Sequence, residues 1–181
     1  MSKPIRPVVI DGGVARVPLT QGVEAIVDLA DIDLVQSRNW YASKGRHTLY
    51  AVSNGERRGS APRAPSVQMH RVVLGLAPDD PREVDHIDHD GLNNRRSNLR
   101  PATRSQNSRN MGSPTGARTP YKGVGWHSRD QSWRAYISID RRQISLGYFA
   151  TEEEAARAYD AAAVEAWGEF AWLNFPEGEP L

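Results

Sequence analysis

Short apolar runs separated by turn residues dominate the first third of the chain. These runs lie at 14–19, 24–29, 40–41 and 49–52. Such runs are typical of short strands. Pro18 cannot donate to a strand ladder, which predicts an edge strand for the first run. Residues 30–38 carry Ile32, Leu34 and Val35 on one side and predict a short helix. The pattern therefore predicts a strand-rich region over residues 1–67.

The pattern changes in the last third of the chain. Runs rich in aromatic and β-branched residues, divided by turn residues, predict a three-stranded antiparallel meander at 121–126, 133–139 and 143–148. Thr151 and Glu154 have the spacing of a capping box. The helix that follows carries an alanine-rich stripe and ends at Gly168. Alanine allows close approach to one face of the sheet, so the other face is expected to be open. The fold class predicted for the whole chain is α+β.

The chain also divides by composition. A stretch rich in Gly, Pro, Ser and Thr around residues 108–120 is the best linker candidate. Between the N-terminal region and this stretch, Met69, Val72, Val73 and Leu76 resume a helical spacing. The predicted domains are a strand-rich region at 1–67, a central domain at 68–110, a linker at 111–120 and a C-terminal domain at 121–176.

Composition excludes several classes of protein. There is no cysteine, which excludes disulfide frameworks, cysteine zinc sites and cysteine nucleophiles. No apolar run reaches the roughly 20 residues of a membrane span, and the N-terminus lacks the long apolar stretch of a secretory signal. We expect a soluble cytoplasmic protein. Residues 91–129 hold eight basic residues and no acidic one. Such a stretch is either a solvated basic face or a surface for a polyanion.

The strongest chemical signal lies at residues 84–107. Asp85 and His86 are adjacent at a predicted strand, and a turn-rich loop follows. Asn98 can begin a returning strand, and the predicted helix after it carries Asn107. This gives a β-β-α unit in which the four side chains are available to converge.

These residue types suit phosphodiester hydrolysis. A base must activate water, and the pKa of histidine permits this near neutral pH. A divalent cation must offset charge on the phosphate. The Asp85 carboxylate and the Asn107 amide are hard oxygen ligands that suit Mg²⁺. Neighbouring residues of a regular strand face opposite sides, so a bulge or a twist is needed if Asp85 and His86 share one site.

Residues 84–107 closely resemble the HNH homing endonucleases, in the variant with Asn in place of the last His. The matching elements are Asp85-His86, the turn at 88–94, the run at 95–100, the segment 103–107 and the lead-in at 69–71. The resemblance implies a ββα-metal nuclease core that cleaves double-stranded DNA and leaves 5′-phosphate and 3′-hydroxyl ends. His89 departs from it, because a glycine is usual there. Its side chain would crowd the turn or reach a phosphate.

The resemblance also assigns roles to single residues. His86 would be the general base, and Asp85 with Asn107 would hold one divalent metal ion, Mg²⁺ or alternatively Mn²⁺. Asn98 would orient His86 or support the loop. The arginines of this segment would include contacts to DNA phosphates, and the candidates are Arg95, Arg96, Arg100 and Arg104.

A second resemblance covers residues 121–176. The segments 121–124, 133–135, 146–149 and 153–160 are similar to the APETALA2-type (AP2) DNA-binding domain. This implies a three-stranded sheet placed in the DNA major groove with a helix behind it. The candidates for DNA contact by position in the motif are Lys122, Trp126, Arg134 and Arg142. Gly125 replaces a basic residue often found in plant members, so sequence preference is not carried over.

Together these features predict a metal-dependent endonuclease of double-stranded DNA that makes a nick or a double-strand break. The resemblance places it as a phage-type homing enzyme in a bacterial cytoplasm, with no membrane partner. Monomer and dimer both stay open. The first alternative is a DNA-binding regulator derived from such a nuclease and unable to cleave. A nuclease directed at RNA is the second.

Overall fold

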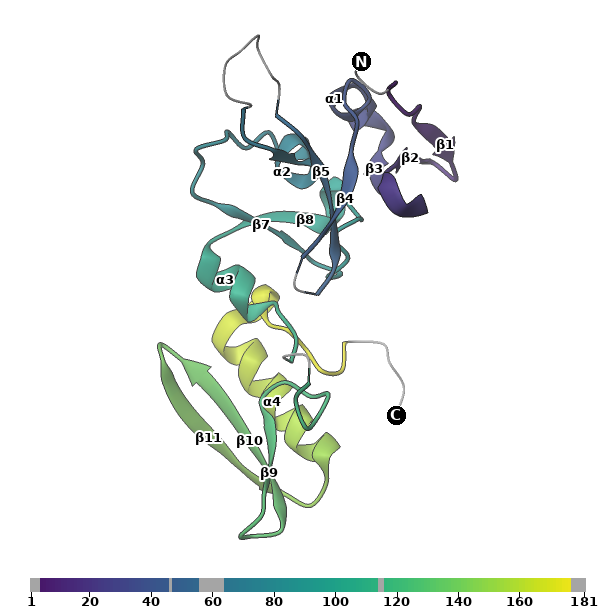
Figure 1. Ribbon diagram of the computed structural model, residues 1–181. Helices are drawn as coiled ribbons and strands as arrows, with labels where there is room; N and C mark the ends of the chain where they lie inside the picture. The colour runs from purple at the N-terminus through teal and green to yellow at the C-terminus, as the bar shows by residue number, and fades with distance from the viewer. Residues whose placement is uncertain (1–3, 46, 56–63, 114–115, 177–181) are drawn as a thin grey trace. The chain divides into compact units, whose positions relative to one another are not determined.

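The computed structural model describes residues 4–45, 47–55, 64–113 and 116–176. The chain forms two compact units, Met1–Arg104 and Ser105–Leu181 (Figure 1). Both combine helices with small antiparallel sheets, which confirms the predicted α+β class. The unit boundary lies within a helix, upstream of the linker predicted at 111–120. In the described part of the chain, no helix is long and apolar enough to cross a membrane.

The first sheet of the N-terminal unit contradicts one prediction. It contains β1 (Val9–Asp11), β2 (Val14–Pro18) and β3 (Glu24–Asp28) in the order β1-β2-β3. The strand that ends in Pro18 is therefore central, not at an edge. The ladder with β1 extends along β2 only as far as Arg16, so Pro18 lies beyond it and pairs with Glu24 alone. The missing N–H of proline is tolerated because no strand of the described residues pairs with Pro18 on that side.

A second sheet and two short helices complete the packing of this unit. The sheet contains β4 (Tyr41–Lys44), β5 (Leu49–Ser53) and β6 (Val67–Gln68), and the helices are α1 (Ile32–Val35) and α2 (Met69–Val73). One apolar core joins them, and its buried members include Val27, Trp40, Met69, Val84 and Leu99. Full burial of one such side chain contributes about 1.5–3 kcal/mol. The region predicted at 1–67 and the first part of the central domain thus share a single core.

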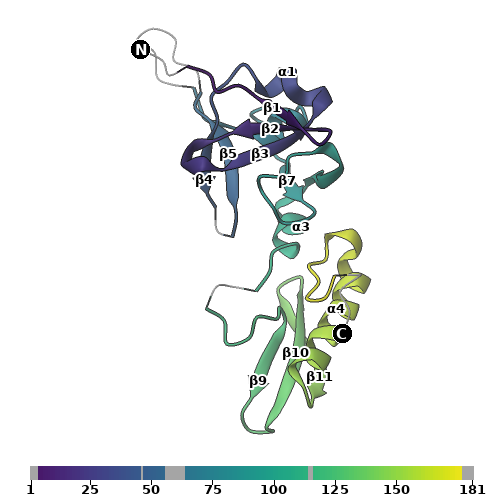
Figure 2. The ribbon, with the colours of Figure 1, turned by 90° about the vertical axis from the view of Figure 1, so that its right-hand side faces the viewer.

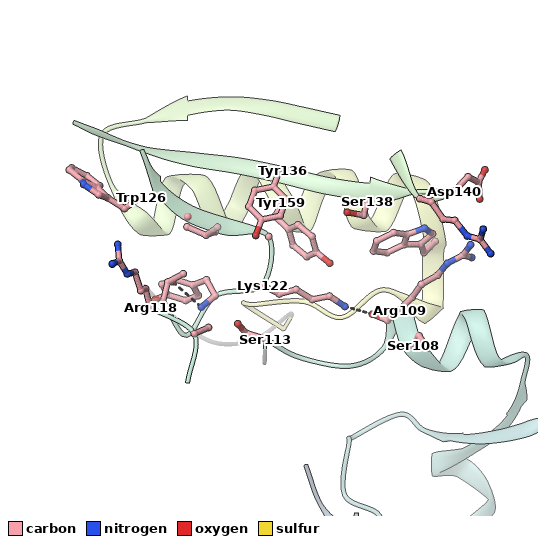
Figure 3. A pocket seen from close by; sticks show the side chains of 18 of the residues that line it. Ser108, Arg109, Ser113, Arg118, Lys122, Trp126, Tyr136, Ser138, Asp140 and Tyr159 are labelled. Atoms are coloured by element: carbon pink, nitrogen blue, oxygen red, sulfur yellow. Dashed lines mark hydrogen bonds between the residues drawn. The ribbon is translucent and has the colours of Figure 1, made fainter. Parts of the chain in front are cut away.

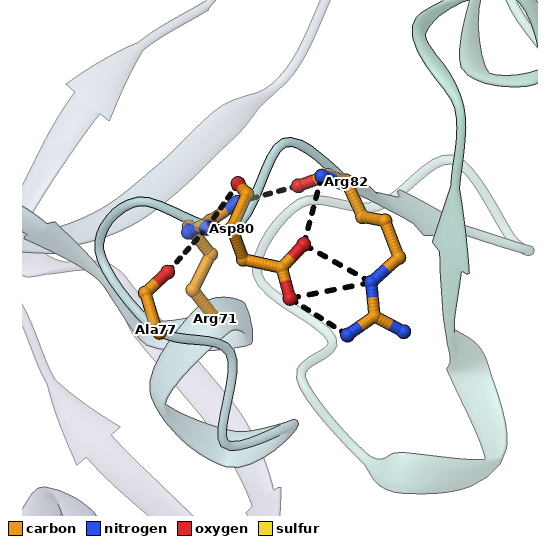
Figure 4. Close-up of polar contacts among 4 residues, drawn as sticks. All are labelled: Arg71, Ala77, Asp80 and Arg82. Atoms are coloured by element: carbon orange, nitrogen blue, oxygen red, sulfur yellow. Dashed lines mark hydrogen bonds and ion pairs between the residues drawn. The ribbon is translucent and has the colours of Figure 1, made fainter.

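Arg71 fixes the connection between α2 and the next strand. Its guanidinium donates to the carbonyls of Ala77, Asp80 and Arg82 at 2.7–3.0 Å. The side chains of Asp80 and Arg82 form an ion pair in the same loop (Figure 4). The chain then enters β7 (Glu83–His86), which pairs with β8 (Leu99–Ala102). The helix α3 (Arg104–Arg109) follows, so the predicted β-β-α order of elements is present.

The C-terminal unit is a sheet covered by one helix. The strands β9 (Val124–His127), β10 (Ser132–Ile139) and β11 (Arg142–Phe149) form the predicted meander, with β10 in the centre. The helix α4 (Glu152–Trp167) lies along one face of it (Figure 2). Its capping box is present, because Thr151 and Glu154 exchange hydrogen bonds of 3.1 and 3.2 Å. Three fully buried alanines, at 155, 156 and 163, allow the close approach.

Candidate functional site

Asp85 and His86 lie at the end of β7, and both are buried. Asp85 faces Arg100 across the ladder, and its Oδ2 accepts from Nη2 at 2.6 Å and from Nε at 2.8 Å. The side chain of Arg100 is only 12% exposed. The structure therefore places Arg100, a candidate for phosphate contact, on the carboxylate of a candidate metal ligand.

His86 packs among aromatic rings. Its ring centroid lies 5.1 Å from that of His70 and 5.9 Å from that of Tyr50. Burial lowers the pKa of His86, while the side-chain interaction with Asn94 and nearby carboxylates oppose this effect. Burial also lowers the pKa of His70, to about 3. A neutral imidazole can accept a proton, which is what a general base requires.

Tyr50 is a residue of this site that the sequence did not reveal. It lies on β5, 36 positions before His86, and no local motif surrounds it. Its ring also lies close to Gly91, where a Cβ atom would come within 2.7 Å of the ring and 2.4 Å of the Leu49 carbonyl. In the sequence, the turn dipeptide Asp90-Gly91 is the one signal for a close backbone approach at this position.

Asn98 supports the loop that follows β7. Its Oδ1 accepts from the backbone N–H of Asp88 at 2.9 Å. Its Nδ2 donates to the Asp88 carboxylate and to the Asn93 carbonyl, both at 2.8 Å. Of the two roles expected for Asn98, these bonds favour loop support. The residue is buried, so its hydrogen bonds have little competition from water.

The N-terminal sheet holds the same loop from its other side. Ile26 on β3 exchanges backbone hydrogen bonds with Leu92 and Asn94 at 2.8 and 2.7 Å. His89 adopts φ 65°, the left-handed conformation that favours glycine. This explains why the HNH resemblance has glycine at that position: the turn requires the conformation, and His89 adopts it with strain.

Arg96 binds within the N-terminal unit. Its guanidinium forms a bidentate pair with Asp31, with Nη2–Oδ1 2.7 Å and Nε–Oδ2 3.0 Å. Asp31 is 2% exposed, so this pair compensates a buried charge. Among the other candidates for phosphate contact, Arg95 donates to Asn93 at 3.2 Å and Arg104 is exposed.

The β7–β8 ladder is regular through His86. Asp85 pairs with Arg100 and His86 with Leu99, without a register shift. The two side chains therefore leave opposite faces of β7. A site shared by Asp85 and His86 depends on the twist where the strand ends, not on a bulge.

Asn107 lies on α3 in the C-terminal unit and is half-buried. Among the described residues, no three His, Cys, Asp or Glu side chains gather as a metal centre. A metal ion in this protein would rely on a carboxylate, amide oxygens and water. Such hard oxygen donors with few protein ligands suit Mg²⁺, which keeps much of its hydration shell.

The register of the C-terminal sheet separates its two faces. Ala135 and Ile137 on β10 are buried against α4, so Arg134 and Tyr136 project from the open face. Trp126 pairs with Trp133, and Arg142 pairs with Ile139, both of which face the helix side. Of the candidates for DNA contact on this sheet, the register therefore assigns only Arg134 to the open face.

Two further side chains share the open face with Arg134. Tyr148 is its cross-strand partner, and His127 packs against Tyr148 with ring centroids 5.2 Å apart. His127 also lies 3.1 Å from a carboxylate oxygen of Asp130. The period-2 alternation starting from buried Val124 is the signal that assigns His127 to this face.

Lys122 points into the C-terminal unit. Its ammonium donates to the carbonyls of Arg109 and Met111, both at 2.6 Å. Burial lowers the pKa of Lys122 to about 8. The side chain lies in a cavity of about 830 Å³ between the segment after α3 and the edge of the sheet (Figure 3).

Comparison with known proteins finds two families along the chain. The family model described as HNH endonuclease matches residues 67–109, and the AP2 domain model matches residues 119–169. An uncharacterized HNH endonuclease of Acanthamoeba polyphaga mimivirus is 34% identical over 159 residues, which cover 85% of this chain and 76% of the viral protein.

The plant relatives match a smaller share of the chain than the viral protein does. The dehydration-responsive element-binding protein 2D of Arabidopsis thaliana is 35% identical over 92 residues, 48% of this chain and 43% of its own length. The AP2-like ethylene-responsive transcription factor AIL7 of the same plant is 46% identical over 57 residues, 30% of this chain and 11% of its own. With the viral relative matching most of both chains, the protein belongs to the HNH endonuclease family and carries an AP2 domain on its C-terminal side.

Proposed function

We propose that the protein is a metal-dependent endonuclease that hydrolyses phosphodiester bonds in double-stranded DNA. The observation that carries this proposal is the pair Asp85-His86, consecutive in sequence and both buried at the end of β7, in a member of the HNH endonuclease family. The sequence resemblance adds the residue-by-residue match of the motif. A homing role and a phage-type origin belong to the same proposal and rest on that resemblance alone.

In this proposal His86 is the general base. Its ring takes a proton from the water that attacks phosphorus. The bond between phosphorus and the 3′ oxygen breaks, and the departing oxygen takes a proton from solvent water to become the 3′-hydroxyl. The support is its neutral form, which burial favours, and its fixed position beside the rings of His70 and Tyr50. Asn98 holds the loop beside it by the bonds to Asp88 and Asn93.

Asp85 and Asn107 are the proposed ligands of one divalent ion, Mg²⁺ or Mn²⁺. When bound, the ion would offset charge on the phosphate and on the departing oxygen. The close ion pair with Arg100 holds the Asp85 carboxylate in a fixed orientation.

DNA is proposed to bind on the open face of the AP2 sheet. Arg134, His127 and Tyr148 lie together on that face and combine a positive charge with aromatic rings. Such residues suit contacts with phosphates and bases. Arg95 and Arg104 are proposed to contact phosphates near the cleavage site. For Trp126 and Arg142, DNA contact is supported by their position in the AP2 motif alone.

The test is cleavage of supercoiled plasmid, of genomic DNA and of duplex RNA by the purified protein with Mg²⁺, with Mn²⁺ and with EDTA. We expect cleavage that requires a metal ion and is lost in His86→Ala but kept in His47→Ala, which alters an exposed histidine. DNA binding without cleavage under all conditions would favour the regulator. Cleavage restricted to duplex RNA would favour the second alternative, and an active His86→Ala protein would remove His86 as the base.

A further inference from the structure

The C-terminal end of α3 is held by side chains that come from beyond the linker. The last carbonyls of a helix have no partner within the helix, and a cation is favourable at that end. Lys122 meets both needs, because its ammonium donates to the carbonyls of Arg109 and Met111 at 2.6 Å each. Figure 3 shows the side chain of Lys122 extended along the cavity toward Arg109.

Two tryptophans add to this attachment. The guanidinium of Arg109 lies 5.6 Å from the centroid of the Trp167 ring, and the Lys122 ammonium lies 5.9 Å from it. The backbone N–H of Trp172 donates to the Arg109 carbonyl at 3.4 Å. A Cβ atom at Gly112 would come within 2.7 Å of the Trp172 ring, so the backbone there lies directly on the indole.

We propose that Lys122 is a positioning residue that anchors α3, and with it Asn107, to the AP2 unit. Asn107 lies two residues before Arg109, so the conformation of the helix end determines where its amide points. This proposal rests on the proposed function, in which Asn107 is a metal ligand. It gives Lys122 a role in catalysis in place of the DNA contact that the motif implies, because the ammonium is turned inward and already holds two carbonyls.

The test compares two variants. Lys122→Met removes the charge and the donors of the side chain but keeps its length, and Lys122→Arg keeps both the charge and the donors. Arg134→Ala is the matched control, because it removes one positive charge from the open face of the same sheet. Three quantities are measured on the full chain: the dissociation constant for DNA in EDTA, the cleavage rate at saturating DNA against Mg²⁺ concentration, and amide hydrogen exchange over residues 104–112.

In Lys122→Met we expect faster exchange over residues 104–112, a higher Mg²⁺ requirement and a cleavage rate about 10- to 100-fold lower, as for residues that orient metal ligands. Its affinity for DNA should change by less than about twofold. Lys122→Arg should recover most of the rate. Arg134→Ala should weaken DNA binding and leave the exchange over residues 104–112 unchanged.

Two results would overturn the proposal. If Lys122→Met weakens DNA binding as Arg134→Ala does, with an unchanged rate at saturating DNA, Lys122 is a DNA contact. If exchange over residues 104–112 is unchanged, Lys122 does not hold α3. The exchange measurement needs no cleavage, so it supports or overturns the anchor even if the wild-type protein fails to cleave and the proposed function falls.

Discussion

Arg100 and Asp85 form a buried ion pair across the β7–β8 ladder. The Nη2–Oδ2 distance is 2.6 Å, and Asp85 is 3% exposed. A buried carboxylate without a partner is strongly disfavoured, and Arg100 supplies that partner for Asp85. Arg100 therefore helps to maintain the structure of the site through this ion pair. That role does not depend on a contact between Arg100 and a DNA phosphate.

Arg100→Gln should therefore lower the free energy of unfolding by about 3–5 kcal/mol, because it leaves a buried charge without a partner. The matched control is Arg104→Gln, which alters an exposed arginine and should change stability by less than about 0.5 kcal/mol. Urea denaturation measures both. The double variant Asp85→Asn/Arg100→Gln should recover part of the loss. Equal stabilities of Arg100→Gln and Arg104→Gln would contradict the role of the pair.

Local patterns of the sequence were sufficient for most elements. Alternating aromatic and β-branched residues predicted β9–β11, and the spacing of Thr151 and Glu154 predicted the start of α4. The order strand, loop, strand and helix over 84–107 was also predicted. These features depend on neighbours within a few residues, which is the range that propensity and capping describe.

Long-range pairings were not predictable in this way. The sequence indicated Arg96 as a phosphate contact. The structure pairs it with Asp31, which lies 65 positions away in the chain. Tyr50 has no motif of its own, and its contact with His86 depends on how β5 packs on α2. Pro18 was wrongly placed at a sheet edge, because its position relative to the end of β1 is set by the hairpin register. The assignment of Arg134 and Trp126 to opposite faces of the sheet depends on strand register in the same way.

Asn98→Ala should destabilise the loop at 88–94. The substitution removes three hydrogen bonds from a buried side chain, at about 1 kcal/mol each, so a loss of about 2–3 kcal/mol is expected. Hydrogen exchange over residues 88–94 should accelerate before the rest of the unit is affected. Asn54→Ala is the control, because that asparagine is exposed. Equal exchange in the two variants would show that other contacts hold the loop.

Arg134→Ala should flatten the salt dependence of DNA binding. One phosphate contact contributes about 0.9 to the slope of log K against log salt concentration. Arg157→Ala makes the same change of charge on the helix side, where the guanidinium lies over the ring of Phe175, and should leave the slope unchanged. Binding titrations at several salt concentrations decide this, and an equal effect of both variants would mean that only net charge matters.

His70 should make the N-terminal unit sensitive to acid. Its pKa is lowered from 6.5 to about 3 by burial, so between these values the unfolded chain binds a proton that the folded chain does not. The stability from neutral His70 is fully present above pH 6.5 and is lost as the pH falls toward 3. At pH 5 the loss should be about 2 kcal/mol.

His70→Phe isolates this effect, because phenylalanine keeps an aromatic ring beside Tyr50 and His86 but does not titrate. Its stability should fall by about 2 kcal/mol less than that of the wild-type protein between pH 7.5 and pH 5. The dependence should be reduced and not abolished, since the lowered pKa of His86 acts in the same direction. His47→Gln removes an exposed histidine and should follow the wild-type curve. If the stability of His70→Phe depends on pH as that of the wild-type protein does, the acid sensitivity comes from His86 and the carboxylates around it.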